Sequence, residues 1–338
     1  MNLTDPKYSR FHLVREMMET AGIIRRFDPK AVEPFVPALR KSGRLFLTGE
    51  GSSRIFPAKR AIYDCLRHAD ALSIAADGAT QALEYDLTRT AVFAASNSGK
   101  TKEVVRLLQR LKGLGHHAAF GLTATPGSPV DELAARSHIL ISGKEDAVAA
   151  TKTVVEQALF YDGLLSAFRK RKMMDLPALA DQFEKALTLP VDPALVRKAM
   201  NATAIYFAGR NNGAAEELTL KTNEITRKKA DFLEGTYAVH GIEEVMDAGE
   251  AVIVLDPFEQ EEGKFKECLV DGVGMTVLAI SSRQTGFPTV LVPDAGAGQP
   301  YVQIAAGWNL LVEIGVGLGI DLDKPQRARK VGNLYPGS

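Results

Sequence analysis

The chain has 338 residues, of which 46% are hydrophobic and 24% charged, with 41 basic and 41 acidic side chains. This composition is typical of a globular protein, and the balanced charge gives no field that would favour nucleic acid or a membrane surface as a partner. No apolar run is long enough to span a bilayer, and the N-terminal residues lack the pattern of a signal peptide. The two cysteines, Cys65 and Cys268, have no metal-ligand spacing, so we expect a cytoplasmic protein.

Residues 1–40 are expected to be helical, and after them the chain repeats itself with an offset of roughly 160 residues. Each copy alternates apolar strands with amphipathic helices and closes with a long apolar helix. The strands predicted in the two copies are 44–49, 91–94, 118–123 and 138–141, then 204–209, 251–255, 276–281 and 289–292.

Strands that are apolar throughout predict parallel sheets covered by helices on both faces. The fold expected is α/β, with two tandem doubly wound domains of the flavodoxin-like, three-layer α/β/α kind. The expected parts are a helical segment 1–40, a first domain 41–170, a helical linker 171–195, a second domain 196–322 and a tail 323–338.

A hydroxyl-rich loop, Ser96-Asn97-Ser98-Gly99-Lys100-Thr101, lies between a predicted strand and a predicted helix. A helix N-terminus offers backbone N–H groups and a positive dipole end, so this loop suits an anion such as phosphate. An ordinary N-cap would explain the same residue types. Ser52 and Ser53 follow the preceding predicted strand and would share the site. The corresponding loop of the second copy, 256–262, is acidic and would repel phosphate.

The second copy carries acid–base groups. Lys221 and Glu224 are three residues apart, hence neighbours on one helical face, and an ammonium beside a carboxylate suits a general base. A surface ion pair would look the same. His240 lies in a glycine-flanked segment and could move protons near neutral pH, although a structural histidine would also fit.

Six short motifs, in this order and spacing, resemble the sugar isomerase (SIS) domain family, to which the isomerase half of glucosamine-6-phosphate synthase belongs. The loop 96–101 resembles the family's Ser-Gln-Ser-Gly-Glu-Thr. The other five motifs are Glu50-Gly51-Ser52-Ser53, the stretch from Glu145 to Lys152, Lys221-Thr222-Asn223-Glu224-Ile225, His240-Gly241, and the stretch from Asp323 to Val331.

The resemblance implies a role for each matching residue. Glu224 would move a proton between C1 and C2 of an open-chain sugar and Lys221 would orient it. His240 would open the sugar ring, reaching in from the partner subunit of a homodimer, and Lys330 would stabilise charge on a substrate oxygen. The residues implied to bind the substrate and its anion are Ser52, Ser53, Ser96, Asn97, Ser98, Lys100, Thr101, Val148 and Ala150. This chemistry requires neither a metal nor a redox cofactor.

Two departures bear on the substrate: Asn97 and Lys100 stand where the family has Gln and Glu. The expected function is aldose–ketose isomerisation of a hexose 6-phosphate or amino-sugar 6-phosphate, with or without deamination or deglycation. Because Lys100 adds a positive charge, a 6-sulfonated sugar such as sulfoquinovose is an alternative. A non-catalytic sugar-phosphate-binding regulator is the alternative from another class. Glutamine-dependent amide transfer is not expected.

Overall fold

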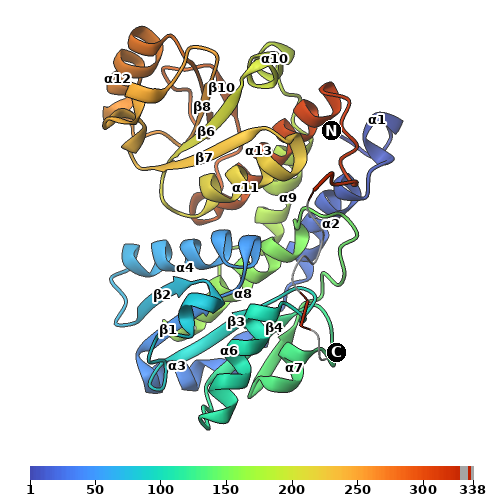
Figure 1. Ribbon diagram of the computed structural model, residues 1–338, viewed down its shortest axis with the longest axis vertical. Helices are drawn as coiled ribbons and strands as arrows, with labels where there is room; N and C mark the ends of the chain where they lie inside the picture. Colours follow the sequence, from blue (N-terminus) through green and yellow to red (C-terminus); the bar gives the residue numbers. More distant parts are fainter. Residues whose placement is uncertain (328–333, 336–338) are drawn as a thin grey trace. The chain divides into compact units, whose positions relative to one another are not determined.

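The computed structural model describes residues 1–327 and 334–335, and the chain divides into two compact units (Figure 1). The sheet-1 unit comprises residues 22–146 and 150–176, together with the C-terminal residues from 327 onward that are described. The sheet-2 unit comprises residues 1–21, 147–149 and 177–326. Each unit contains one parallel five-stranded sheet.

The sheet of the sheet-1 unit has the strand order β2-β1-β3-β4-β5, and all its strands are parallel. Its strands are β1 Arg44–Thr48, β2 Ser73–Asp77, β3 Ala91–Ala95, β4 Ala119–Thr123 and β5 Arg136–Ile139. Its helices are η1 Pro29–Phe35, α3 Val36–Ser42, η2 Gly51–Ser53, α4 Ile55–Arg67, α5 Ala79–Ala82, α6 Lys102–Gly113, α7 Pro129–Leu133 and α8 Lys152–Phe168.

Alternate residues of the central strand β3 face the two helical layers. Val92 and Ala94 belong to the hydrophobic cluster that α5, α6 and α7 form with one face of the sheet. Phe93 points the other way, with its ring 5.5 Å from that of Phe160 on α8 and 5.4 Å from that of Phe35 in η1. Because both faces are buried, β3 reads as a continuous apolar run.

The sheet-2 unit repeats this topology, with the strand order β10-β9-β8-β6-β7. Its strands are β6 Ala204–Gly209, β7 Lys229–Glu234, β8 Ala251–Leu255, β9 Thr276–Ser281 and β10 Thr289–Leu291. Its helices are α1 Pro6–Ser9, α9 Leu176–Thr188, α10 Pro193–Asn201, α11 Ala214–Thr226, η3 Tyr237–Val239, η4 Ile242–Val245, η5 Glu259–Glu261, α12 Glu262–Phe265, the π-helical η6 Lys266–Val273, η7 Gly296–Gly298 and α13 Gln299–Gly317. Helix α2, His12–Arg26, has residues in both units.

The predicted fold class is confirmed: two parallel sheets, each covered by helices on both faces, follow one another along the chain. Two strands were missed, β2 and β7, which are edge strands of their sheets. Each is only partly buried and mixes charged with apolar residues, so neither forms a continuous apolar run. Over the part of the chain that is described, no helix has the length and apolar character needed to cross a membrane.

Candidate functional site

The candidate anion site lies where the topology of the sheet-1 unit reverses. Strands β1 and β3 are hydrogen-bonded neighbours, and the chain leaves them toward opposite edges of the sheet. Ligands of open α/β sheets bind in the crevice beyond the carboxyl ends of such strands. Ser52 and Ser53 follow β1, and Ser96 directly follows β3, so the structure brings the two predicted serine turns to the same edge.

The two turns approach closely because Gly49 has no side chain. A Cβ on Gly49 would stand 2.9 Å from the carbonyl oxygen of Ala95 and 3.1 Å from the Cβ of Ser53. Between the turns, Ser52 and Ser96 are buried, with 8% and 2% of their surfaces exposed. Glu50 precedes these serines, and burial raises the pKa of its carboxyl group even though it accepts a bond from the backbone N–H of Ala79, 3.0 Å away.

The hydroxyl groups of the loop do not cap helix α6 in the ordinary way. Thr101 is the N-cap residue, yet its side chain makes no capping hydrogen bond within the described structure. Its Oγ1 lies instead 2.8 Å from Oγ of Ser96, and Oγ of Ser98 accepts from the backbone N–H of Lys100 at 3.2 Å. The N-cap interpretation therefore does not account for these hydroxyls, whose arrangement suits an anion at the helix N-terminus.

Gly99 is required for the shape of the loop. Its φ is +63°, in the left-handed region that glycine adopts most readily. A Cβ there would lie 1.9 Å from Oγ of Ser128, and the backbone oxygen of Gly99 accepts from the N–H of Val130 at 3.1 Å. Any larger residue would push the loop away from helix α7, so Gly99 fixes the path of the candidate anion site.

Asn97 is tied to a residue that sequence reasoning did not single out. Its Nδ2 donates to Oε2 of Glu145 at 3.2 Å, and Glu145 is fully buried. Ala150 is half-buried two residues before α8 in this unit. Val148 lies in the stretch 147–149 of the sheet-2 unit, where the N–H of Ala147 donates to the Glu16 carboxylate.

The predicted acid–base pair lies on helix α11 of the sheet-2 unit. Nζ of Lys221 is 2.7 Å from Oε2 of Glu224 and 3.3 Å from Oε1 of Glu217, one turn earlier. The side chains of Lys221 and Glu217 are fully buried, whereas that of Glu224 is 23% exposed. This is not a surface ion pair: a buried ammonium holds one carboxylate that remains accessible to a substrate.

The other two predicted catalytic residues are described to different extents. His240 is exposed after η3, with Nε2 3.1 Å from Oγ1 of Thr236. Lys330 lies outside the described residues. Of the tail that carries it, Leu334 forms an isolated antiparallel bridge with Thr101, and the N–H of Tyr335 donates to the backbone oxygen of Lys100 at 3.0 Å. The end of the tail thus contacts the hydroxyl-rich loop inside the sheet-1 unit.

The sheet-2 unit has a different arrangement at the corresponding strand ends. Asp256 follows β8 as Ser96 follows β3, and its Oδ2 accepts from Nε of Arg210 at 2.9 Å. Its Oδ1 accepts from Oγ of Ser281 at 3.3 Å. The Asp256 carboxylate therefore occupies this position and is held by the guanidinium of Arg210, which follows β6. The sequence predicted only that the acidic loop repels phosphate, and the structure adds this ion pair.

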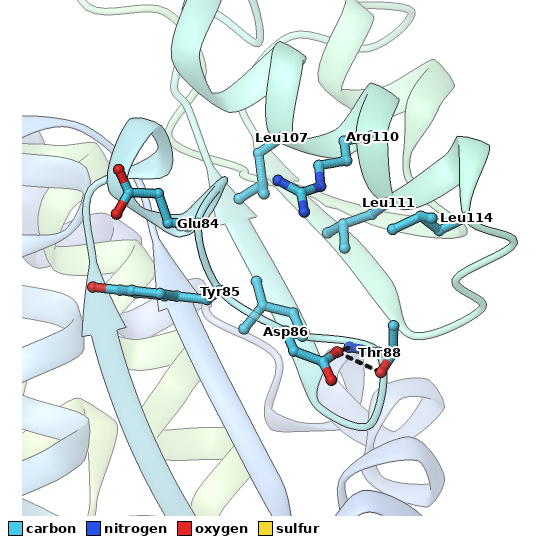
Figure 2. A pocket seen from close by; sticks show the side chains of 10 residues that line it. Glu84, Tyr85, Asp86, Thr88, Leu107, Arg110, Leu111 and Leu114 are labelled. Carbon is cyan, nitrogen blue, oxygen red and sulfur yellow. Dashed lines mark hydrogen bonds between the residues drawn. The ribbon is translucent and has the colours of Figure 1, made fainter.

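A pocket of the sheet-1 unit lies away from this site. It has a volume of about 240 Å³ and is lined by Leu107, Arg110 and Leu111 of α6, by Leu114 just after that helix, and by the segment 84–88 (Figure 2). Because that segment precedes β3, the pocket lies toward the amino end of the strand, opposite the serine turns. A second pocket, of about 600 Å³, is lined by α1, α10 and α13 in the sheet-2 unit. None of the predicted site residues that the structure describes lines either pocket. The described residues contain no cluster suited to a metal ion.

Comparison with known proteins agrees with this architecture. Residues 38–167 match the family model described as the SIS domain. Glutamine–fructose-6-phosphate aminotransferase (isomerizing) of Aeropyrum pernix is 26% identical over 265 residues, which are 71% of this chain and 43% of that protein. The Halobacterium salinarum protein of the same name is 28% identical over 262 residues, again 71% and 43%. The chain thus spans less than half the length of these relatives.

Solved structures share the fold across nearly the whole chain. The C-terminal domain of glucosamine-fructose-6-phosphate aminotransferase from Francisella tularensis superposes with a TM-score of 0.79 at 15% identity, covering 93% of this chain and 98% of that one. Tagatose-6-phosphate ketose/aldose isomerase from Escherichia coli gives 0.79 at 17% identity, covering 96% and 99%. Residues 38–167 therefore match a SIS domain, and the chain as a whole shares its fold with the C-terminal domain of the aminotransferase and with the ketose/aldose isomerase.

Proposed function

We propose that this chain is a sugar phosphate isomerase that moves a proton between C1 and C2 of an open-chain hexose 6-phosphate or amino-sugar 6-phosphate. The observation that carries the proposal is the Ser96–Thr101 loop at the switch point, whose hydroxyls bond one another and leave the helix N-terminus without a side-chain cap. Such a loop suits a terminal phosphate. The relatives named fructose-6-phosphate aminotransferases, and the neighbours named glucosamine-6-phosphate deaminase and tagatose-6-phosphate isomerase, support the same class.

In the proposed reaction Glu224 removes the proton from one carbon and returns it to the next. Aldose–ketose exchange needs one such base, stabilisation of the enediolate oxygen and an acid for ring opening. Lys221, buried between Glu217 and Glu224, fixes the direction of the Glu224 carboxylate. Lys330 supplies positive charge to the substrate oxygen, and His240, exposed after η3, opens the ring from the partner subunit of a homodimer.

The phosphate is held by the hydroxyls of Ser52, Ser53, Ser96, Ser98 and Thr101. Of these, Ser52 and Ser96 are buried, so an anion bound there exchanges water for fixed donors. Lys100 lies in the same loop and adds a positive charge. Lys100 stands where the resembling family has Glu, and this departure is the observation behind a second candidate, a 6-sulfonated sugar, whose sulfonate offers tetrahedral oxygens and a negative charge to the same loop.

Product analysis tests the proposal. The full chain is incubated with fructose, glucosamine and fructosamine 6-phosphates and with a 6-sulfonated hexose, and the products are separated. We expect turnover of at least one 6-phosphate, and release of ammonia or of an amine would identify deamination or deglycation. Binding of these ligands without turnover would support the regulator alternative, and neither binding nor turnover in a folded protein would contradict the proposal.

A further inference from the structure

We propose that Glu145 is a positioning residue that holds the candidate anion loop in its binding shape, acting through Asn97. The proposal rests on the proposed function for its ligand but on the structure for its geometry. Glu145 lies between β5 and α8 and is fully buried. It touches the loop 96–101 through one side chain only among the contacts described, that of Asn97.

The carboxylate of Glu145 accepts five hydrogen bonds among those described. Oε1 accepts from the N–H and the hydroxyl of Thr151, at 2.7 and 3.1 Å, and from the N–H of Lys152 at 2.9 Å. Oε2 accepts from the hydroxyl of Thr153 and from Nδ2 of Asn97 at 3.2 Å. Glu145 thus caps the N-terminus of the 17-residue helix α8 and joins it to the anion loop.

The bond to Glu145 settles how Asn97 is oriented. A carboxylate accepts only from N–H and O–H groups, so the amide nitrogen of Asn97 faces Glu145 and the amide oxygen faces away. An outward oxygen accepts from a sugar hydroxyl but repels an anion. The amide nitrogen keeps a second N–H that can donate to the anion, so Asn97 can serve the anion as well as a sugar hydroxyl.

The backbone of Asn97 fixes the loop from the other side. Its carbonyl oxygen accepts from the N–H of Ala124 at 3.1 Å and from the hydroxyls of Thr123 and Thr125 at 3.1 and 3.2 Å. Asn97 is thus held at its backbone by the end of β4 and at its side chain by Glu145. Loss of the carboxylate would release the side chain while the backbone bonds remain.

The test compares Glu145→Gln with Glu156→Gln. Glu156 is a matched control because it is also buried in the sheet-1 unit, 1% exposed on α8, and accepts two backbone N–H groups, those of Ile141 and Ser142 at 2.8 and 2.7 Å. It makes no described contact with the loop 96–101. A general loss of packing or helix capping would affect both variants, whereas loss of loop positioning would affect only the first.

Binding of inorganic phosphate and of glucosamine 6-phosphate is measured by calorimetry for both variants, for Asn97→Ala and for the double variant Asn97→Ala/Glu145→Gln. We expect Glu145→Gln to weaken the binding of glucosamine 6-phosphate by about tenfold and to raise KM more than it lowers kcat. In the double variant, it should add little to the loss of affinity that Asn97→Ala causes alone. Additive losses in the double variant, or equal losses in Glu145→Gln and Glu156→Gln, would overturn the proposal.

Hydrogen exchange separates this proposal from the proposed function. In the ligand-free protein we expect the amides of residues 96–101 to exchange faster in Glu145→Gln than in the wild type, and to be unchanged in Glu156→Gln. If the wild type binds neither ligand, the proposed function fails, and the hydrogen-exchange measurement alone tests the positioning role of Glu145. Unchanged exchange of the loop in Glu145→Gln would then overturn the positioning role.

Discussion

The same position in the two sheets carries opposite chemistry. Ser96 follows β3 and Asp256 follows β8, and the backbone N–H of each donates to the neighbouring strand, at 2.9 Å to Leu122 and 3.0 Å to Ile280. In the sheet-1 unit the strand ends present hydroxyls, whereas in the sheet-2 unit Asp256 itself occupies the place and Arg210 neutralises it. The fold accommodates either arrangement, so the hydroxyl-rich loop is not a requirement of the topology.

The two units also differ in where their buried charges lie. The described part of the sheet-2 unit buries Lys221 between two carboxylates on one helix and leaves Glu224 accessible. In the sheet-1 unit, the carboxylate next to the anion loop, Glu145, is instead enclosed by donors. We therefore assign anion binding to the sheet-1 unit and proton transfer to the sheet-2 unit, a division that substitutions can break.

Glu224→Gln should have the largest effect. Loss of the base should lower kcat by about 10³-fold, while sugar phosphate affinity should change by less than about threefold, because the anion loop is untouched. Steady-state kinetics and calorimetry measure the two quantities. Glu216→Gln, on the same helix α11, is the control and should retain activity. Parallel losses of binding and turnover in Glu224→Gln would make Glu224 a structural residue.

Ser96→Ala should mainly affect binding. The Ser96 hydroxyl bonds Thr101 and is proposed to bond the anion. Its removal should weaken the binding of inorganic phosphate by about tenfold, since hydrogen bonds to charged groups are worth about 1.5–3 kcal/mol. The control is Ser281→Ala, which removes a buried hydroxyl at the end of β9 in the sheet-2 unit. Equal phosphate affinity in Ser96→Ala and Ser281→Ala would contradict the assignment of anion binding to the sheet-1 unit.

Glu50→Gln should tighten phosphate binding by about two- to threefold at neutral pH, because it removes a carboxylate beside the serine turn. The pKa of Glu50 is raised by burial, so its contribution to stability is present below the pKa of the unfolded state and is lost as pH rises through the folded-state pKa. The variant should therefore gain stability relative to wild type as the pH increases from 4 to 7, as a denaturation series at several pH values would reveal. A constant difference across that range would contradict this account of Glu50.

Asp256→Asn should have the smallest effect. Asn tolerates the φ of +46° found at this position, and the ion pair with Arg210 is about a third exposed, so unfolding free energy should fall by about 1 kcal/mol or less. Freed of its partner, Arg210 should bind phosphate weakly, and titration should reveal a second, weak site in each chain. The added substitution Arg210→Gln should remove that site. A single site in Asp256→Asn would mean that Asp256 does not occupy an anion position.

The sequence predicted the architecture because strands and helices leave local patterns, and it predicted that the hydroxyl-rich loop follows a strand. Buried parallel strands are apolar throughout, and the loop 96–101 combines hydroxyls with a glycine that the structure requires. The edge strands β2 and β7 were not predicted, because half-buried edge strands are not apolar throughout. Glu145 matched a family motif, but its partners are 6 to 48 residues away, and no local pattern reveals such a contact.

The ion pair between Arg210 and Asp256 was not predicted either, because it is also a contact between residues far apart in the sequence. Its members are 46 residues apart and meet only because β6 and β8 are neighbours in the sheet. A run of acidic residues in sequence indicates repulsion of an anion, whereas the structure adds the guanidinium that compensates one of them. Strand order determines which residues meet in this way, and it depends on the whole fold, not on the sequence near Arg210 or Asp256 alone.

The most direct test of the division of labour is solvent hydrogen exchange into the sugar. The protein is incubated in D₂O with fructose 6-phosphate or glucosamine 6-phosphate, and deuterium at C1 and C2 is followed by NMR. We expect incorporation with the wild type, none above background with Glu224→Gln, and little with the same sugars lacking the phosphate. Incorporation that survives Glu224→Gln, or that does not depend on the 6-phosphate, would contradict the account.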